Sequence, residues 1–262
     1  MNLLRFAITV PLILVLGAAI AACSDDDGGI SGSGNIVTRD FDLSGFTSVS
    51  LSTFSAEITQ SETYSVTVRV DDNILDLIDV DATGETLALT HSGKSFKGNV
   101  TLEATITMPD IESLELSGAA SADLDGFDSL DAFELDLSGA SSVTGKLTAG
   151  SVEIDASGAS RVTADLAADD VDIRATGASR VTLDGSATNV TVDASGASRI
   201  DIEDLEAATG EVELSGASDA TVNITDTIDS VDVSGASTLR YLGDPTLGDV
   251  STSGASSVDQ ID

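Results

Sequence analysis

The chain repeats the segment Ser-Gly-Ala, or Thr-Gly-Ala, at a nearly constant interval, and this repeat limits the possible folds more than any other feature. The glycines of the eight copies are Gly118, Gly139, Gly158, Gly177, Gly196, Gly216, Gly235 and Gly254, so successive copies lie 21, 19, 19, 19, 20, 19 and 19 residues apart. A period of about 20 residues is typical of proteins in which similar units stack on one another. The sequence therefore predicts a repeat architecture.

Apolar and polar residues alternate on both sides of each glycine. In the copy around Gly158, Ile154 and Ala156 flank the charged Asp155, and Val162 follows four residues after the glycine. An alternation of period two indicates a strand with one packed face and one face in water. Glycine suits the corner between two strands because it adopts positive φ and lets backbones approach closely. Each copy is expected to supply two strands and a corner.

We predict an all-β fold in which residues 111–262 form a single-stranded parallel β-helix, right-handed, with about 19–20 residues per coil. Nineteen residues at about 3.3 Å each span at most about 60 Å, which is enough for a narrow three-sided coil. The alternative is a left-handed coil of six-residue units. It would need turns of about 18 residues, and the observed spacing of mostly 19 residues fits the right-handed form better.

Residues 1–22 have the build of a lipoprotein signal peptide. Arg5 precedes an apolar run over residues 6–19, and small residues come directly before Cys23. Such a run is short for a membrane-spanning helix and typical of a secretory signal. The small residues before the cysteine resemble the bacterial lipobox, which implies lipidation of Cys23; a plain signal peptide with an incidental cysteine is the alternative. By the sorting rule of Gram-negative lipoproteins, Ser24 implies the outer membrane.

Two segments separate this signal from the repeats. Residues 23–34 are acidic and rich in Gly and Ser, so they predict a tether that cannot build a core. Residues 35–110 have strand-like alternation without the repeat, and one short helical turn is expected within residues 71–77. Stacked repeats need terminal units with a different face to seal the core. We therefore expect residues 35–110 to form irregular first coils and a cap.

Several motifs across the mature chain resemble one known family. They are Gly34-Asn35, the run from Asp42 to Val49, the run from Asp71 to Leu75, Thr86-Leu87, the run from Ile106 to Leu116, and Ser117-Gly118-Ala119. Together they resemble the head GIN domain of "putative autotransporter adhesins". This resemblance implies an exported bacterial protein with β-helical structure and a binding role at the cell surface.

The charge balance is strongly acidic, with 45 Asp and Glu against 11 Lys and Arg and a net charge of −34. This balance excludes nucleic acid as a partner, because binding phosphates requires clustered basic residues. Acidic residues recur five and three positions before the glycines, as in Glu134/Asp136, Glu153/Asp155 and Glu211/Glu213. Loosely bound Ca²⁺ could relieve the repulsion between them, and screening by salt is the alternative. No calcium-loop motif is present, so no cofactor or dedicated metal site is predicted.

Three basic residues, Arg161, Arg180 and Arg199, occupy the same position in consecutive copies. Stacked repeats would place them in one column, which could receive an anionic sugar or another ligand that carries carboxylates. The alternative interpretation is that these arginines pair with neighbouring acidic residues. They are the candidate ligand-binding residues of the chain.

The sequence favours a binding scaffold over an enzyme. Some parallel β-helices act on polysaccharides, but this chain has a single histidine, His91, no tryptophan and nine Phe and Tyr residues. Sugar-degrading grooves usually use aromatic platforms and a placed base. We expect His91 to lie exposed in a hairpin turn, and no catalytic residue is predicted.

We therefore predict a lipid-anchored exported protein that acts as an adhesion or binding scaffold at the cell envelope. Its partners would be the membrane, through Cys23, and a glycan or protein ligand. A polysaccharide-active enzyme and a purely structural envelope lipoprotein are the alternatives. The last coil, at residues 256–262, could support oligomers through its strand edges, and its aspartates could instead guard those edges.

Overall fold

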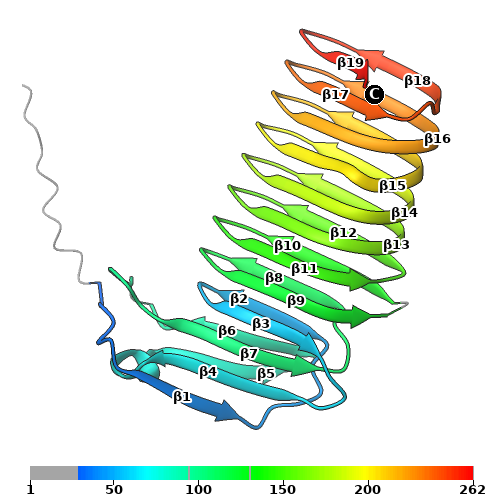
Figure 1. The fold of residues 1–262 in the computed structure, drawn as a ribbon. Helices are drawn as coiled ribbons and strands as arrows, with labels where there is room; N and C mark the ends of the chain where they lie inside the picture. The colour runs from blue at the N-terminus through cyan, green and yellow to red at the C-terminus, as the bar shows by residue number, and fades with distance from the viewer. Residues whose placement is uncertain (1–28, 94, 130, 262) are drawn as a thin grey trace, which may run out of the picture.

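The protein is a long column of β-coils that stands on an N-terminal layer of strands (Figure 1). The structure, a computed structural model, describes residues 29–93, 95–129 and 131–261. These residues form strands β1 to β19 and one short 3-10 helix, η1. The described strands pair into one continuous system along the column. The predicted all-β architecture of stacked parallel coils is confirmed.

The repeat region forms two parallel ladders of strands. Its strands are β8 (Ser113–Ser117), β9 (Ser121–Asp128), β10 (Ala132–Leu137), β11 (Ser142–Thr148), β12 (Ser151–Ala156), β13 (Arg161–Ala175), β14 (Arg180–Ala194), β15 (Arg199–Leu214), β16 (Asp219–Val233), β17 (Thr238–Leu242), β18 (Thr246–Thr252) and β19 (Ser257–Gln260). The first ladder joins β8, β10 and β12 to the second half of β13. The second ladder joins β9 and β11 to the first half of β13. Each coil thus contributes one segment to each ladder.

The two ladders are joined at one edge by a short segment that also pairs from coil to coil. Along β13 the alternation of buried and exposed residues is interrupted between Leu166 and Val171, where the chain passes from one ladder to the other. Leu166 pairs with Gly185, Gly185 pairs with Leu205, and Leu205 and Ala207 are buried. At the opposite edge the Ser-Gly-Ala segment reverses the chain in a tight turn. Each of these coils therefore has two long sides and one short side.

The interior of the column is filled by aliphatic side chains that lie above one another. The residues four positions before the glycines are paired in register from coil to coil and are buried: Ile154, Ile173, Val192, Val212 and Val231. In the other ladder, Val162 and Val181 are paired and buried, while Thr163 between the buried positions is exposed. The predicted inward and outward alternation of both strands is therefore confirmed.

The repeated glycines form a single column at one edge of the coils. Gly158 has a φ of 76°, and the amide of Ala159 donates a 2.7 Å hydrogen bond to the carbonyl oxygen of Gly139 in the preceding coil. A Cβ added at Gly158 would lie 2.5 Å from that same oxygen. Both the positive φ and the close approach require glycine. The predicted alignment of the Ser-Gly-Ala segments is confirmed.

The N-terminal region mixes parallel and antiparallel pairing. It contains β1 (Ile36–Phe41), β2 (Ser48–Ser52), β3 (Ser55–Gln60), β4 (Ser65–Asp71), η1 (Asp72–Leu77), β5 (Ile78–Thr83), β6 (Thr86–His91) and β7 (Leu102–Met108). The antiparallel pairs are β1 with β4, β4 with β7, and β5 with β6. The irregular strands and the short helical turn that the sequence predicted are both present.

The stacking order of this region differs from the order along the chain. β2 lies between β6 and β8, and β3 lies between β7 and β9. The coil that comes first in sequence is therefore the second layer of the column, and the chain returns from β7 to build β8 on its far side (Figure 1). This insertion ties the N-terminal layer to the first repeat coil.

The corner of the β2–β3 coil is a shortened version of the repeat corner. Thr53 stands at the glycine column, next to Gly118, and it is the one described non-glycine residue with positive φ, at 70°. Two residues, Thr53 and Phe54, separate Ser52 from β3, and the ring of Phe54 is fully buried. A bulky aromatic side chain thus fills the interior at this end of the column, where the next coil has Ala120 and the following coils have buried serines.

Candidate functional site

The edge of the column that carries the glycines also contains a line of buried serines. In six of the eight copies the residue two positions after the glycine is a fully or almost fully buried serine: Ser141, Ser160, Ser179, Ser198, Ser218 and Ser237. Ser179 Oγ donates to the carbonyl of Thr176 at 2.6 Å, and Ser198 Oγ donates to that of Ser195 at 2.7 Å. These hydroxyls are occupied in holding the turn, so they stabilise the edge. The sequence reasoning overlooked them, although their fixed place after Gly-Ala was a usable signal.

Beside this edge, the three candidate arginines form a column. Arg161 pairs in register with Arg180, and Arg180 pairs with Arg199, at the starts of β13, β14 and β15. All three side chains are exposed. They line a shallow groove of about 190 Å³ together with the Ala-Ser steps of the turns and Asp219. The structure therefore brings together the residues that the sequence selected.

The arginines differ in their ionic contacts. Arg199 Nη2 donates to Asp219 Oδ2 at 3.2 Å, in the next coil. Among the described residues, no carboxylate oxygen lies within 4.0 Å of a guanidinium nitrogen of Arg161 or Arg180. Pairing with neighbouring acids thus accounts for one of the three arginines, and two guanidinium groups keep their hydrogen-bond donors open to solvent.

The opposite outer face carries the acidic columns. Glu134 pairs in register with Glu153, and Glu153 with Asp172, while Asp136 pairs with Asp155. The predicted columns are therefore present in the described strands. Glu134, Glu153 and Asp172 line an open groove of about 720 Å³ along the first ladder, and Asp136 and Asp155 line a second groove of about 390 Å³.

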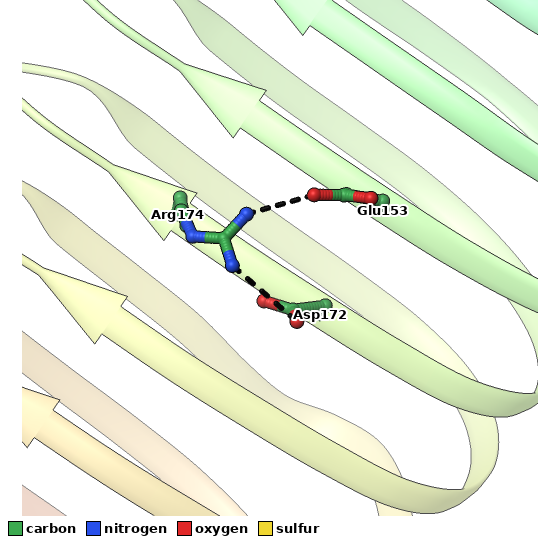
Figure 2. Close-up of polar contacts among 3 residues, drawn as sticks. All are labelled: Glu153, Asp172 and Arg174. Atoms are coloured by element: carbon green, nitrogen blue, oxygen red, sulfur yellow. Dashed lines mark hydrogen bonds and ion pairs between the residues drawn. The ribbon is translucent and has the colours of Figure 1, made fainter.

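Arg174 interrupts the acidic columns. It occupies the position of Asp155 in the next coil, and its Nη1 donates to Glu153 Oε1 at 2.7 Å while Nη2 lies 3.9 Å from Asp172 Oδ2 (Figure 2). The hydrogen bond to Glu153, together with the surrounding negative charges, raises the pKa of Arg174 above its usual value. One guanidinium thus bridges two strands and relieves part of the repulsion on this face.

Two carboxyl groups on the acidic face hold protons more tightly than usual. Burial raises the pKa of Asp136, and the charges of Glu134 and Asp155 raise it further. Burial also raises the pKa of Asp172, although Arg174 opposes this shift. Both effects follow from bringing like charges together on a partly buried surface. This face is therefore the electrostatically least favourable part of the column.

The described residues contain no group of three or more His, Cys, Asp or Glu side chains arranged to hold a metal ion. The acidic columns are lines of side chains on a flat face, whereas calcium sites wrap six to eight oxygens around the ion.

His91 does not lie in a hairpin turn, so that expectation is wrong. It is the last residue of β6, paired with Ile78 of β5, and its ring packs against Phe96 with a centroid distance of 4.8 Å. The hairpin of this region lies at the other end of the two strands, at Gly84. The half-buried ring has its Nδ1 buried without a hydrogen-bond partner, so His91 contributes to packing at the edge of the N-terminal layer.

The chain section that would connect to a lipid anchor is bound to this same layer. Ile30 pairs with Phe96, and the buried carboxylate of Asp71 accepts hydrogen bonds from the amides of Gly34, at 2.6 Å, and Thr101, at 2.8 Å. Cys23 and the predicted signal peptide lie outside the described residues. None of the helical segments that the structure describes has the length and hydrophobicity needed to span a membrane.

Comparison with known proteins identifies a family and several structures of the same shape. The family described as "Putative auto-transporter adhesin, head GIN domain" matches residues 45–245. No curated protein matches the chain. Among solved structures, a "putative lipid binding protein" from Parabacteroides distasonis has a TM-score of 0.84 and 18% identity, and it covers 89% of this chain and 99% of its own.

Two further solved structures are described as putative adhesins. The one from Bacteroides fragilis has a TM-score of 0.69 and 23% identity, with 89% of this chain and 100% of its own covered. The one from Parabacteroides merdae has a TM-score of 0.71 and 16% identity, with 89% and 99% covered. At these identities the likeness establishes the fold of the chain.

Proposed function

The chain belongs to the head GIN domain family of "putative auto-transporter adhesins", and from this premise we propose that it is an exported, lipid-anchored scaffold that binds ligands at the cell envelope. The observation that carries the proposal is the register of the outward side chains. From β13 to β14 every residue of the strand except Asp169 lies beside its counterpart in the next coil, while local register shifts occur between β14, β15 and β16. A ligand with repeating groups could therefore make the same contact on successive coils, and such multiple contacts strengthen binding.

The rigidity of the column suits this role. Each coil pairs with two neighbours through both ladders, and the interior is packed with aliphatic side chains along its length. A binding face on such a support is preorganised, so little conformational freedom is lost when a ligand binds.

The proposed anchor would place the N-terminal layer near the membrane and the repeat coils away from it. Residues 30–35 are held against the N-terminal layer through Phe96 and Asp71. A lipid on Cys23 would therefore lie near this layer, and the repeat coils would project beyond it. Acyl chains contribute about 0.8 kcal/mol per buried methylene, so several chains would keep the protein on the membrane. The outer membrane is the proposed location.

Attachment of cells tests this function directly. Bacteria that produce the full chain, bacteria that lack it, and bacteria that produce C23S would be compared on surfaces coated with glycans or extracellular-matrix proteins. We expect attachment only with the full chain, and we expect C23S to be lost from the outer-membrane fraction because it lacks the acyl anchor. Equal attachment of all three strains would contradict the adhesion role.

Exposure at the cell surface is a separate measurement. Protease added to intact cells should remove the repeat coils if the protein faces outward, and should leave them intact if the protein faces the periplasm. Full protection, together with unchanged attachment when the gene is absent, would favour the structural-lipoprotein alternative.

One observation favours a second candidate, a polysaccharide-active enzyme. The acidic groove places Glu134, Glu153 and Asp172 along one open face, and the pKa of Asp172 is raised. A carboxyl group that holds its proton more tightly than usual can act as a general acid beside a second carboxyl group. Incubation of the purified protein with polyuronides, followed by measurement of new reducing or unsaturated ends, tests this candidate. Turnover lost in D172N would support it.

Self-association through the last coil is part of the proposal. β18 pairs with β16, and Leu247 and Val250 of β18 are 38% and 47% exposed. Exposed strand edges with apolar side chains favour pairing with another chain. Sedimentation of the wild type and of L247K/V250K at several concentrations should show association in the first and its loss in the second.

A further inference from the structure

We infer that the column of Arg161, Arg180 and Arg199 is a binding site for a linear anionic glycan, whose carboxylate or sulfate groups each contact one arginine. This inference names the ligand class for the proposed binding function and rests on it.

The spacing is set by the ladder. Arg161, Arg180 and Arg199 are directly paired positions of β13, β14 and β15. Neighbouring strands lie about 4.8 Å apart, so the three side chains start from points at that interval along the column axis. A ligand that runs along the axis would meet an identical cationic group at each step, whereas a ligand that runs along a strand would meet only one.

The guanidinium N–H groups of Arg161 and Arg180 are free to donate hydrogen bonds to a ligand. Elsewhere Lys146 and Arg174 each have a carboxylate within 2.7 Å. Arg161 and Arg180 have none within 4.0 Å among the described residues, although the chain contains 45 Asp and Glu. Three adjacent positive charges repel one another unless an anion lies between them. A guanidinium presents donors that match a carboxylate or sulfate with two hydrogen bonds, and this geometry makes such an anion a suitable partner.

Apart from the arginines and Asp219, the groove is lined by small side chains. On one side it is bounded by the turns, whose Ala159, Ala178 and Ala197 are small and exposed. On the other side the next outward column places hydroxyl groups, Thr163 and Thr182, beside Arg161 and Arg180, and Asp201 beside Arg199. Asp219, the carboxylate that lines the groove, also lies at the Arg199 end. A chain of sugar rings could therefore approach the backbone closely beside Arg161 and Arg180, and the acidic side chains lie at the Arg199 end.

The absence of aromatic residues from the lining of this groove decides which glycans fit. Neutral sugars are usually held by stacking on aromatic rings, and none lines the described groove. Recognition must then come from charge and hydrogen bonds. Nucleic acid is a poorer candidate, because its dense phosphates require more cationic contacts than three and are repelled by a net charge of −34. A glycan with about one anionic group per sugar fits better.

Binding of defined glycans to the purified full chain tests the inference. The probes are oligogalacturonate, which carries carboxylates, sulfated dextran oligosaccharides, and uncharged dextran, each measured by calorimetric titration at physiological and at high salt. We expect at least one anionic probe to bind, with weaker binding at high salt, and the uncharged probe not to bind. The two anionic probes distinguish carboxylate from sulfate recognition.

Two matched sets of variants locate the site. R161Q/R180Q/R199Q should bind at least about tenfold more weakly than the wild type, since each charged hydrogen bond contributes more than a neutral one. R39Q/R69Q/R174Q changes the net charge by the same amount on other parts of the protein and should bind as the wild type does. D219N frees Arg199 and should tighten binding about threefold, while D249N, on the other ladder, should not.

The outcomes separate the inference from the proposed function. No binding of either anionic glycan overturns the inference, as do equal losses in the two triple variants, unchanged binding in R161Q/R180Q/R199Q, or no effect of D219N. The proposed function survives these results if cells that produce the protein still attach to coated surfaces. Loss of attachment in R161Q/R180Q/R199Q, with retained attachment in R39Q/R69Q/R174Q, supports both.

Discussion

The repeat coils and the N-terminal region bury similar aliphatic side chains, but they are connected in different ways. In the coils, each strand pairs with a strand about one repeat away, as Arg161 pairs with Arg180. In the N-terminal region, β2 pairs with β8, which begins 65 residues after it, and β3 pairs with β9. The coils are therefore built from near neighbours in sequence, whereas the N-terminal region closes contacts over long distances.

This difference indicates how each region obtains its stability. Repeat arrays gain stability from similar interfaces between neighbouring units. The N-terminal region instead has single large side chains at unique places, such as Phe54 and Phe46, both fully buried. A substitution in one coil should destabilise that coil and its neighbours. A substitution of Phe54 or Phe46 should destabilise the N-terminal end of the column.

The largest loss of stability is expected when the buried ring of Phe54 is removed. F54A should destabilise the protein by about 3–5 kcal/mol, because it deletes a fully buried ring and leaves a cavity. V162A, in a repeat coil, removes fewer buried atoms and should cost about 2 kcal/mol or less. Urea denaturation of both variants measures the difference. Equal losses would show that Phe54 contributes no more to stability than one aliphatic side chain of a repeat coil.

The next effect tests the glycine column. G177A should cost about 3 kcal/mol, because the residue has a φ of 76° and the new Cβ would lie 2.6 Å from the carbonyl oxygen of Gly158. G45A is the matched control from the N-terminal region, with a φ of 83° and no atom within 4 Å of the added Cβ. It should cost about 1 kcal/mol, from the backbone conformation alone. Similar losses in both would remove close stacking as the reason for the repeated glycine.

A smaller change in stability, of opposite sign, is expected at Thr53, where the N-terminal region interrupts the column of glycines. T53G relieves the unfavourable φ of 70° and should stabilise the protein by about 0.5 kcal/mol, because relief of strain slightly exceeds the added freedom of the unfolded chain. The same denaturation experiment detects it. A loss of stability would show that the Thr53 side chain itself, which lies beside Gly118, helps to hold the corner.

The sequence predicted most of the repeat coils because their information is local. The fixed spacing of the glycines set the register, and that register placed Arg161, Arg180 and Arg199 in one column as expected. The buried serines were missed because serine is usually exposed, and their partners are carbonyls that only the folded turn brings close.

The N-terminal region was harder to predict because its order depends on distant contacts. Alternation indicated strands, but nothing in residues 36–108 signals that β2 and β3 insert between β6–β7 and β8–β9. The role of Asp71 was also invisible, since its partners Gly34 and Thr101 lie 37 and 30 residues away. The open donors of Arg161 and Arg180 likewise required the structure, because pairing with acids depends on side-chain placement.

The smallest expected effect concerns pH, and it has opposite signs in the two regions. On the repeat coils, the pKa of Asp136 is raised above 3.8 by burial and by neighbouring negative charges. The folded chain thus binds this proton more tightly than the unfolded chain, so ionised Asp136 destabilises the fold at neutral pH and the penalty disappears as the pH falls through the raised pKa. D136N should melt at a slightly higher temperature than the wild type at pH 7, and the two should converge near pH 4.

In the N-terminal region, hydrogen bonds from Ser33 and Asn35 lower the pKa of Asp72 below 3.8. Ionised Asp72 therefore stabilises the fold above its ordinary pKa, and that contribution is lost only as the pH falls through the lowered value. D72N should melt slightly below the wild type at pH 7 and should approach it only below about pH 4. Melting curves of both variants and the wild type between pH 7 and pH 3 test the contrast. If the two differences from the wild type have the same sign at pH 7, the two regions do not differ in their electrostatics as the structure indicates.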